Sequence, residues 1–170
     1  MSYQELSSHR LILLKPSDNY VNDLYYLRTH PSVNKYIQRT PSKSIDEVTG
    51  FIEKTRTNIH NNQSCYWFIV EKNNAQFTGT ICLWNFSKDQ KTVEIGYELL
   101  PEHQGKGFMN EALGLVLKFG LEILKLQVIE AYTHKDNQNS IKLLKKNGFQ
   151  KSVNNPTNND INNIVFELKK

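Results

Sequence analysis

A chain of 170 residues that is 38% hydrophobic and 22% charged has the composition of an ordinary globular protein, and we expect one domain over residues 1–170. The formal net charge of +4 is spread over basic runs of at most two residues, which argues against a nucleic-acid-binding protein. No apolar stretch approaches the roughly 20 residues that span a bilayer, and no signal-like segment follows Met1. These features predict a cytoplasmic protein that makes no membrane contact.

The N-terminal third predicts a strand followed by two helices. The apolar run over residues 10–15 is typical of a strand. Ser17 or Asp18 can cap a helix that carries its apolar residues on one face and ends before the next proline. The second helix is predicted over residues 44–60, because it starts at a Ser-x-x-Glu capping box and its apolar residues recur at helical spacing.

The rest of the chain alternates strands and helices. Three strands joined by hairpin-like connections are predicted over residues 65–71, 77–85 and 92–100. A long helix is predicted over residues 107–124 and a strand over residues 127–133. A short helix closed by Gly148 follows over residues 140–147, and residues 149–153 and 161–168 are predicted to form a final hairpin. This order predicts an α/β (α+β) fold whose mixed sheet is largely antiparallel at its start.

Cysteine and histidine residues give no sign of a metal site or a disulfide. Cys65 and Cys82 lie in apolar, strand-like runs without C-x-x-C or Cys/His ligand spacing, so we expect reduced thiols. The five histidines are scattered along the chain, and no metal is predicted.

The most informative segment is the glycine-containing turn between the strand of residues 92–100 and the long helix. Gly105 and Gly107 permit positive φ angles and close backbone approach, and the first N–H groups of a helix lack intrahelical partners. With Lys106 adding charge, the turn can bind a phosphate or pyrophosphate. It fits neither a Walker A loop nor a dinucleotide-binding G-x-G-x-x-G motif. The alternative is a tight turn that needs glycine for its geometry alone.

The same turn resembles the Q/R-x-x-G-x-G/A signature of the GNAT (GCN5-related) N-acetyltransferase superfamily, with Gln104, Gly107 and Met109 on its defining positions. Met109 departs from Gly/Ala, as is familiar in the ribosomal-protein N-terminal acetyltransferase (RimJ/RimL-like) branch. Three further segments, collinear over nearly the whole chain, resemble that branch: residues 9–16, residues 94–97, and the N-x-x-S…L…G-F block of Asn137, Ser140, Leu144, Gly148 and Phe149.

The resemblance implies a single GNAT-type domain whose fourth and fifth strands splay apart around acetyl-CoA, the cosubstrate. Backbone groups near Leu99 and Leu100 would pair with the pantetheine arm. Asn137 would hydrogen-bond the pantetheine region from the far side. The pyrophosphate would lie on the turn, which is formed by Gln104, Gly105, Lys106, Gly107, Phe108 and Met109.

Acetyl transfer to an amine requires a neutral amine, an oxyanion stabiliser and a proton for the departing thiolate. Glu94 and Glu98 are the acidic residues of the fourth strand and share one face at a spacing of four. Glu94 lies at the position of the base in several GNAT members, so we expect it to act through water, with Glu98 as the alternative. Both could instead be ordinary solvent-facing glutamates.

Ser140 matches the position from which a hydroxyl protonates the CoA sulfur in the ribosomal-protein branch. Helix capping is its alternative role. Tyr97 and Tyr132 are further hydroxyl candidates, although core packing also explains them. A backbone N–H near Leu99 or Leu100 is the expected oxyanion stabiliser, and His134 and Trp84 could line the acceptor pocket.

We therefore expect direct acetyl transfer without a metal or covalent intermediate. The resemblance favours a protein N-terminal amine as acceptor, with a polyamine or an aminoglycoside as the enzymatic alternatives and a non-catalytic CoA-binding module as the rival from another class. Nucleic acid is not an expected partner. Monomer and homodimer both remain open.

Overall fold

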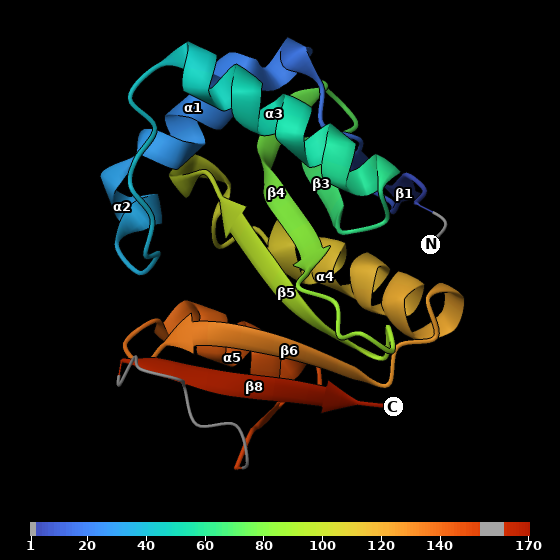
Figure 1. Cartoon of the computed structure of the whole chain (residues 1–170). Helices are drawn as coiled ribbons and strands as arrows, with labels where there is room; N and C mark the ends of the chain where they lie inside the picture. The colour runs from blue at the N-terminus through green and yellow to red at the C-terminus, as the bar shows by residue number, and fades with distance from the viewer. Residues whose placement is uncertain (1–2, 154–161) are drawn as a thin grey trace.

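One sheet organises residues 3–153 and 162–170, the part of the chain that the computed structural model describes. In this part eight strands pair in the order β1-β2-β3-β4-β5-β6-β8-β7 (Figure 1). Their bounds are β1 Leu6–Ser7, β2 Leu11–Leu14, β3 Cys65–Glu71, β4 Gln76–Trp84, β5 Thr92–Leu99, β6 Val128–His134, β7 Gln150–Lys151 and β8 Asn163–Lys169.

The sheet divides at β5 and β6. Every other pair of neighbouring strands is antiparallel, whereas β5 and β6 are parallel and stay in register only from Thr92↔Val128 to Glu94↔Glu130. Beyond this short pairing the two strands diverge, as Figure 1 shows. The predicted mixed sheet, splayed between the fourth and fifth predicted strands, is therefore confirmed; the short β1, which was not predicted, shifts their numbers to five and six.

Helices cover both faces of the sheet (Figure 1). Their bounds are α1 Val21–Thr29, α2 Pro31–Asn34, α3 Ile45–His60, α4 Phe108–Lys118 and α5 Gln138–Lys146. Successive side chains of β3 point to opposite faces of the sheet. Trp67 packs in the core with α4, and Phe68 packs in the core with α1 and α3. Both side chains are fully buried, which explains the nearly continuous apolar run of this strand.

The helix predictions hold with local differences. Ser44 caps α3 by accepting the Glu47 N–H at 3.3 Å, but the Glu47 carboxylate accepts the N–H of Lys43 rather than that of Ser44. The first helix begins with a 3-10 turn, Asp18–Tyr20, and the four-residue α2 was not predicted. The predicted 107–124 helix is α-helical only to Lys118 and continues as a π-helical turn, Phe119–Ile123.

The C-terminal hairpin is present in shorter form. Strands β7 and β8 pair antiparallel, and Gly148 adopts the left-handed conformation (φ 84°) predicted for the residue that follows α5. The predicted start of the last strand, Ile161, lies outside the described residues, and β8 begins at Asn163.

Candidate active site

The turn between β5 and α4 has the geometry of an anion-binding helix start. Gly105 and Gly107 adopt φ angles of 74° and 80°, in the left-handed region that favours glycine. Gly107 is the N-cap of α4 and, having no side chain, leaves the first N–H groups of the helix without a side-chain acceptor. The predicted need for glycine at both positions is confirmed, and the uncapped helix start remains open to an anion.

Arg10, the residue that directly precedes β2, holds this turn. Its guanidinium donates to the Lys106 carbonyl at 3.0 Å and to the Glu111 carboxylate at 2.7 Å, and it lies 4.7 Å from the centre of the Phe108 ring. Glu111 also accepts from the Arg10 backbone N–H, which fixes α4 against the start of β2. The conformation of the turn is thus determined by contacts about 100 residues apart in the sequence.

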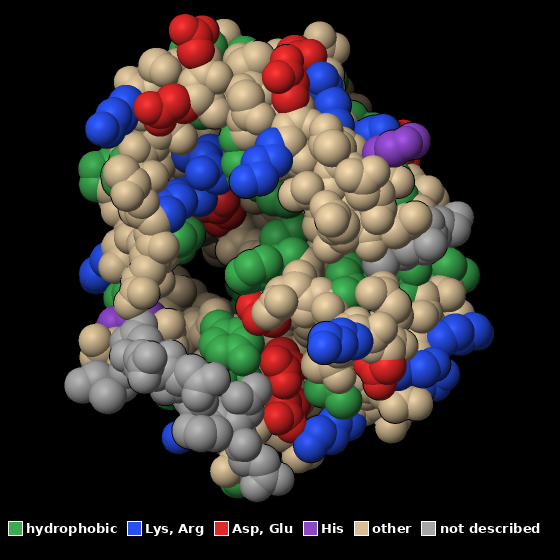
Figure 2. Space-filling view, viewed as in Figure 1, with side chains coloured by type: hydrophobic (Ala, Val, Ile, Leu, Met, Phe, Trp, Pro, Cys, Tyr) green, Lys and Arg blue, Asp and Glu red, His purple; other side chains and the backbone are tan. Residues whose placement is uncertain are grey.

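A cavity of about 470 Å³ opens where β5 and β6 diverge. Figure 2 shows the molecule hollowed between the strands up to β5 and the β6–β8 ribbon. Five segments line the cavity: α2 with the residues after it, β5, the glycine turn, β6 and α5. Of the predicted cofactor-binding residues, the lining includes Leu99, Gln104, Gly105, Gly107, Phe108, Met109 and Asn137.

Leu100 and Lys106 do not line the cavity. Leu100 is buried, and its N–H donates to the Thr78 carbonyl at 2.9 Å, so this group is occupied within the sheet. Since successive N–H groups of a strand point to opposite edges, those of Tyr97 and Leu99 face the gap between β5 and β6. The Leu99 carbonyl accepts a hydrogen bond from the Gln104 side chain at 3.1 Å.

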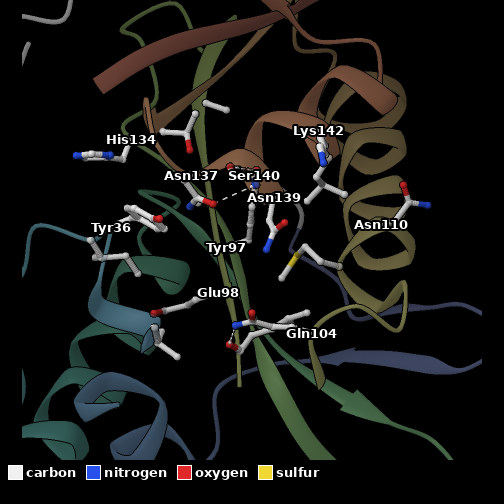
Figure 3. A pocket seen from close by; sticks show the side chains of 18 of the residues that line it. Tyr36, Tyr97, Glu98, Gln104, Asn110, His134, Asn137, Asn139, Ser140 and Lys142 are labelled. Carbon is white, nitrogen blue, oxygen red and sulfur yellow. Dashed lines mark hydrogen bonds between the residues drawn. The ribbon is translucent and has the colours of Figure 1, made fainter. Parts of the chain in front are cut away.

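Two hydroxyls meet inside the cavity. The side chains of Tyr97 on β5 and Ser140 on α5 form a 2.8 Å hydrogen bond (Figure 3). Asn137 is the cap of α5 and accepts the Ser140 N–H at 3.2 Å, so the capping role considered for Ser140 belongs to Asn137. Burial raises the pKa of Tyr97 to about 12, with the bond from Ser140 acting in the opposite direction. Tyr97 therefore keeps its proton at neutral pH.

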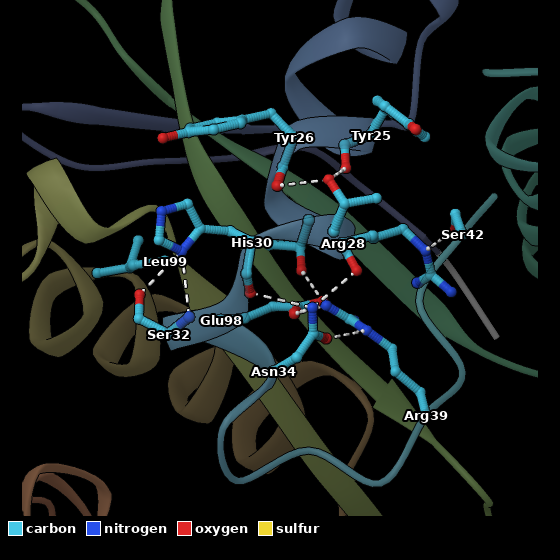
Figure 4. A network of polar contacts seen from close by, with 12 residues as sticks. Tyr25, Tyr26, Arg28, His30, Ser32, Asn34, Arg39, Ser42, Glu98 and Leu99 are labelled. Atoms are coloured by element: carbon cyan, nitrogen blue, oxygen red, sulfur yellow. Dashed lines mark hydrogen bonds and ion pairs between the residues drawn. The ribbon is translucent and has the colours of Figure 1, made fainter. Parts of the chain in front are cut away.

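Glu98 lines the cavity as half of an ion pair. Both of its oxygens lie 2.8 Å from the Arg39 guanidinium, and both side chains are largely buried, with 11% and 15% of their surface exposed. Arg39 also donates to Asn34, whose amide in turn donates to the carbonyls of Arg28 and His30 (Figure 4). This network ties β5 to the segment around α2.

Glu94 lies four residues back on the same face of β5, outside the cavity lining. Burial raises the pKa of its carboxyl, the Asn85 side chain lowers it by hydrogen bonding, and the nearby Glu130 raises it. Glu130 is the registered partner of Glu94 on β6 and accepts a bond from Tyr132 at 3.3 Å. The structure thus separates the two candidate bases, with Glu98 paired in the cavity and Glu94 at the apex of the splay.

The remaining candidates fall into two groups. His134 and Tyr132 line the cavity, whereas Trp84 is about half exposed on the end of β4 and does not. The ring of Tyr36 lies 5.3 Å from that of His134, so the segment after α2 closes over the end of β6. The sequence analysis missed Tyr36 as a lining residue; a tyrosine in a polar loop carries no signal for this position.

Among the described residues, no group of three His, Cys, Asp or Glu side chains could hold a metal ion. In the same part of the chain, no helix is both long and apolar enough to cross a membrane. Cys65 and Cys82 are free thiols, as predicted, and burial raises the pKa of each to about 12.

Comparisons with known proteins show the family to which the chain belongs. The family model for the acetyltransferase (GNAT) domain matches residues 10–150. Uncharacterized N-acetyltransferase YoaA of Bacillus subtilis (strain 168) is 30% identical over 146 residues, which cover 86% of this chain and 82% of that protein. Spermidine N(1)-acetyltransferase of Escherichia coli (strain K12) is 27% identical over 147 residues, which cover 85% of this chain and 75% of that protein.

A solved structure shows the same fold. RimL, a ribosomal L7/L12 alpha-N-protein acetyltransferase in complex with coenzyme A, matches with a TM-score of 0.84 at 17% identity, and 98% of each chain is covered. The family match extends over most of the chain and includes both the glycine turn and α5. The chain therefore belongs to the GNAT acetyltransferase family and is an acetyl-CoA-dependent N-acetyltransferase.

Proposed function

We propose that this enzyme transfers the acetyl group directly to a primary amine at the point where β5 and β6 diverge. The observation that carries the proposal is the Tyr97–Ser140 hydroxyl pair, which joins β5 to α5 in the cavity wall. The turn of residues 104–109 opens into the same cavity and would bind the pyrophosphate through backbone N–H groups. Asn137 would contact the pantetheine arm from α5.

In the reaction, the amine nitrogen bonds to the thioester carbonyl carbon and the carbon–sulfur bond breaks. The sulfur leaves with the bonding electrons as a thiolate, and the amine loses a proton as the amide forms. The hydroxyls of Tyr97 and Ser140 can donate hydrogen bonds to the thiolate and deliver the proton that it needs. The N–H groups of Tyr97 and Leu99, which face the gap, are the proposed oxyanion stabilisers.

The acceptor amine must arrive neutral or lose a proton to a base. Glu98 is poorly suited to this task, because Arg39 binds both of its oxygens and favours the carboxylate form. Glu94 is better suited, because burial raises the pKa of its carboxyl toward the operating pH. Since Glu94 lies outside the cavity lining, it would act through water.

For the acceptor we propose a protein N-terminal amine, as in the ribosomal-protein branch. At pH 7 an α-amine, with a pKa near 7.7–8.0, is about one-tenth neutral, whereas a lysine-like amine is neutral in about one molecule in 2,500. The lower pKa reduces the work left to a distant base. Polyamine and aminoglycoside acceptors are the alternatives. A cytoplasmic location stays a prediction from the sequence, and no oligomeric state is predicted.

The test is an acetylation screen over N-terminal peptides, spermidine and kanamycin, with products identified by mass spectrometry. Gly107→Val should abolish turnover and acetyl-CoA binding, because valine is strained at a φ of 80° and its Cβ would lie 3.4 Å from the Arg10 guanidinium that holds the turn. Gly114→Val is the matched control, since an added Cβ at Gly114 meets nothing within 4 Å. Tight acetyl-CoA binding without acetylation of any amine would instead support a non-catalytic CoA-binding module.

A further inference from the structure

A cluster of two arginines and one glutamate lies on the Glu98 side of the cavity, and of the three only Glu98 is part of the cavity lining. This guanidinium cluster consists of Arg28 on α1, Arg39 in the segment before α3, and Glu98 on β5 (Figure 4). The Arg39 guanidinium forms an ion pair with Glu98 and donates hydrogen bonds to Glu98 and to the side chain of Asn34. The pair Arg39–Glu98 is therefore neutral, and Arg28 supplies an additional positive charge.

Arg28 has no carboxylate partner among the described residues. Its Nε donates to the Ser42 hydroxyl at 3.3 Å, and its guanidinium stacks 4.1 Å from the centre of the Phe51 ring. Burial and the charge of Arg39 lower the pKa of Arg28, while Tyr66 and Glu98 raise it. The terminal nitrogens of Arg28 have no acceptor among the described residues and are not sealed from solvent, so they are available to bind an anion.

Among the described residues, the cavity lining contains no uncompensated carboxylate. Glu98 is the acidic residue of the lining and is neutralised by Arg39, whereas Lys142 adds a positive charge. Figure 2 shows Lys and Arg side chains gathered around a carboxylate on the wall of the hollow beside α1, α2 and the start of α3. Glu94, the proposed base, lies outside this lining at the splay apex and accepts a hydrogen bond from Asn85. A polycation placed along the Arg28 wall would meet net positive charge.

On the basis of the proposed function, we propose that the acceptor amine also carries an oxyanion, either a carboxylate or a phosphate. Arg28 binds this oxyanion. The guanidinium presents two free terminal nitrogens, which match the paired oxygens of either group. The Arg39–Glu98 ion pair holds the wall in place and prevents Glu98 from neutralising Arg28. The acceptor would thus be bipolar, with its amine toward the thioester and its oxyanion toward α1.

The experiment compares acceptors that differ only in the anion. The first pair is a peptide with a free N-terminus and Asp at its second position, compared with the same peptide carrying Asn there. The second pair is glucosamine 6-phosphate and glucosamine. Spermidine serves as the polycationic acceptor for comparison. For the wild-type enzyme we expect the kcat/KM of the anionic member of at least one pair to be about tenfold higher or more. The pair that shows the preference identifies the oxyanion.

Substitutions assign the preference to Arg28. Arg28→Gln should reduce it to about threefold or less, and Arg28→Lys should retain part of it, because lysine keeps the charge but loses the two-nitrogen geometry. Lys54→Gln, which removes an exposed positive charge from α3, is the matched control and should leave the preference intact. A merely structural role of Arg28 on Phe51 would lower the rates of both members of a pair equally, and that result would overturn the inference.

Binding separates this inference from the proposed function. Calorimetry of glucosamine 6-phosphate and glucosamine, and of both peptides, with CoA-saturated protein needs no turnover. A tenfold binding preference for an anionic member without any acetylation would support the anion site and contradict the enzyme proposal. Spermidine as the best acceptor, unaffected by Arg28→Gln, would overturn the anion site and leave the acetyltransferase standing. Equal binding and equal turnover within both pairs would also overturn it.

Discussion

At the scale of single residues, the reaction depends most directly on the two hydroxyls of Tyr97 and Ser140. Their 2.8 Å bond makes them one proton path, so each substitution should interrupt the same step. We expect Tyr97→Phe and Ser140→Ala each to lower kcat by about 10- to 100-fold, with little change in acetyl-CoA affinity. Because the two act together, the double variant should lose little more than either single variant. Steady-state kinetics with calorimetry measures both quantities.

Tyr26→Phe provides the control, because it removes a hydroxyl from an exposed tyrosine on α1. If Ser140→Ala lowers the melting temperature but leaves kcat unchanged, Ser140 only supports α5. If the two single effects multiply in the double variant, the hydroxyls work in separate steps.

Glu94 gives a prediction in pH dependence. Because the pKa of Glu94 is raised, its carboxyl stays protonated to a higher pH and cannot accept a proton there. We therefore expect kcat/KM to rise with pH as Glu94 ionises. Glu94→Gln should flatten this acidic limb and lower the plateau about tenfold or more. Glu98→Gln should keep the limb, although it leaves Arg39 unpaired and should destabilise the fold. Loss of the limb in Glu98→Gln alone would move the base to Glu98.

Stability gives an independent reading of the same carboxyl. Folded Glu94 binds its proton more tightly than the unfolded chain does, so its ionisation costs stability, which falls as the pH rises through the raised pKa. Glu94→Gln should therefore raise the melting temperature at pH 7. Below about pH 4, where the carboxyl is protonated in both states, it should change little.

The residues that the sequence could and could not predict differ in how their contacts arise. The sequence predicted a helix over residues 140–147 with Ser140 as its possible cap; the helix lies there but begins at Gln138, and Asn137 caps it through a bond that spans three residues. The Arg39–Glu98 pair joins residues 59 positions apart, and nothing in the polar loop around Arg39 indicates β5 as its destination. For this reason Glu98 could be proposed as a base, since the cation that occupies it is visible only in the folded chain.

At the scale of elements, the glycine turn and α4 act as one unit because Arg10 binds both. The guanidinium bonds to Lys106 at the turn and Glu111 inside the helix. We expect Arg10→Gln to raise the Kd of acetyl-CoA about tenfold, since the N–H groups of the turn lose their fixed orientation and a nearby positive charge is removed. Calorimetry provides the measurement, and Arg56→Gln, which breaks an ion pair with Asp18 at 2.9 Å, is the control. Equal affinities would show that the turn holds its conformation without Arg10.

Sequence periodicity predicted whether a segment is a helix or a strand, but it did not predict where a helix changes its hydrogen-bonding pattern. The apolar residues of the 107–124 segment keep helical spacing throughout, so a single helix was predicted. The segment turns π-helical at Phe119, and Gly120 within this turn packs closely, because a Cβ there would lie 3.0 Å from the Leu126 side chain and 3.3 Å from that of Ile129. Such close contact depends on residues outside the segment, which periodicity does not describe.

At the scale of the whole molecule, the sheet consists of two parts that meet along a short seam. One part ends at β5 and carries the glycine turn, and the other begins at β6 and carries α5. The strands are in register at the seam only from Thr92 to Glu94, and a shared apolar core also joins the two parts. A molecule of acetyl-CoA in the cavity would touch both parts and join them where the strands do not pair.

This arrangement predicts how binding changes amide hydrogen exchange. With acetyl-CoA in 100-fold excess over its Kd, the folded state gains about 2.7 kcal/mol. Hydrogen exchange at the edges of β5 and β6 that face the gap should slow by more than this uniform effect, because the ligand occupies the gap and hinders local opening. We therefore expect the largest added protection in residues 95–110 of one part and residues 131–143 of the other, and the smallest in α3, which lies away from the cavity lining. Hydrogen exchange with mass spectrometry, with and without acetyl-CoA, measures these segments separately. Protection confined to residues 95–110 would mean that the cofactor binds the glycine turn without bridging to α5, and the roles proposed for Asn137 and Ser140 would then fail together.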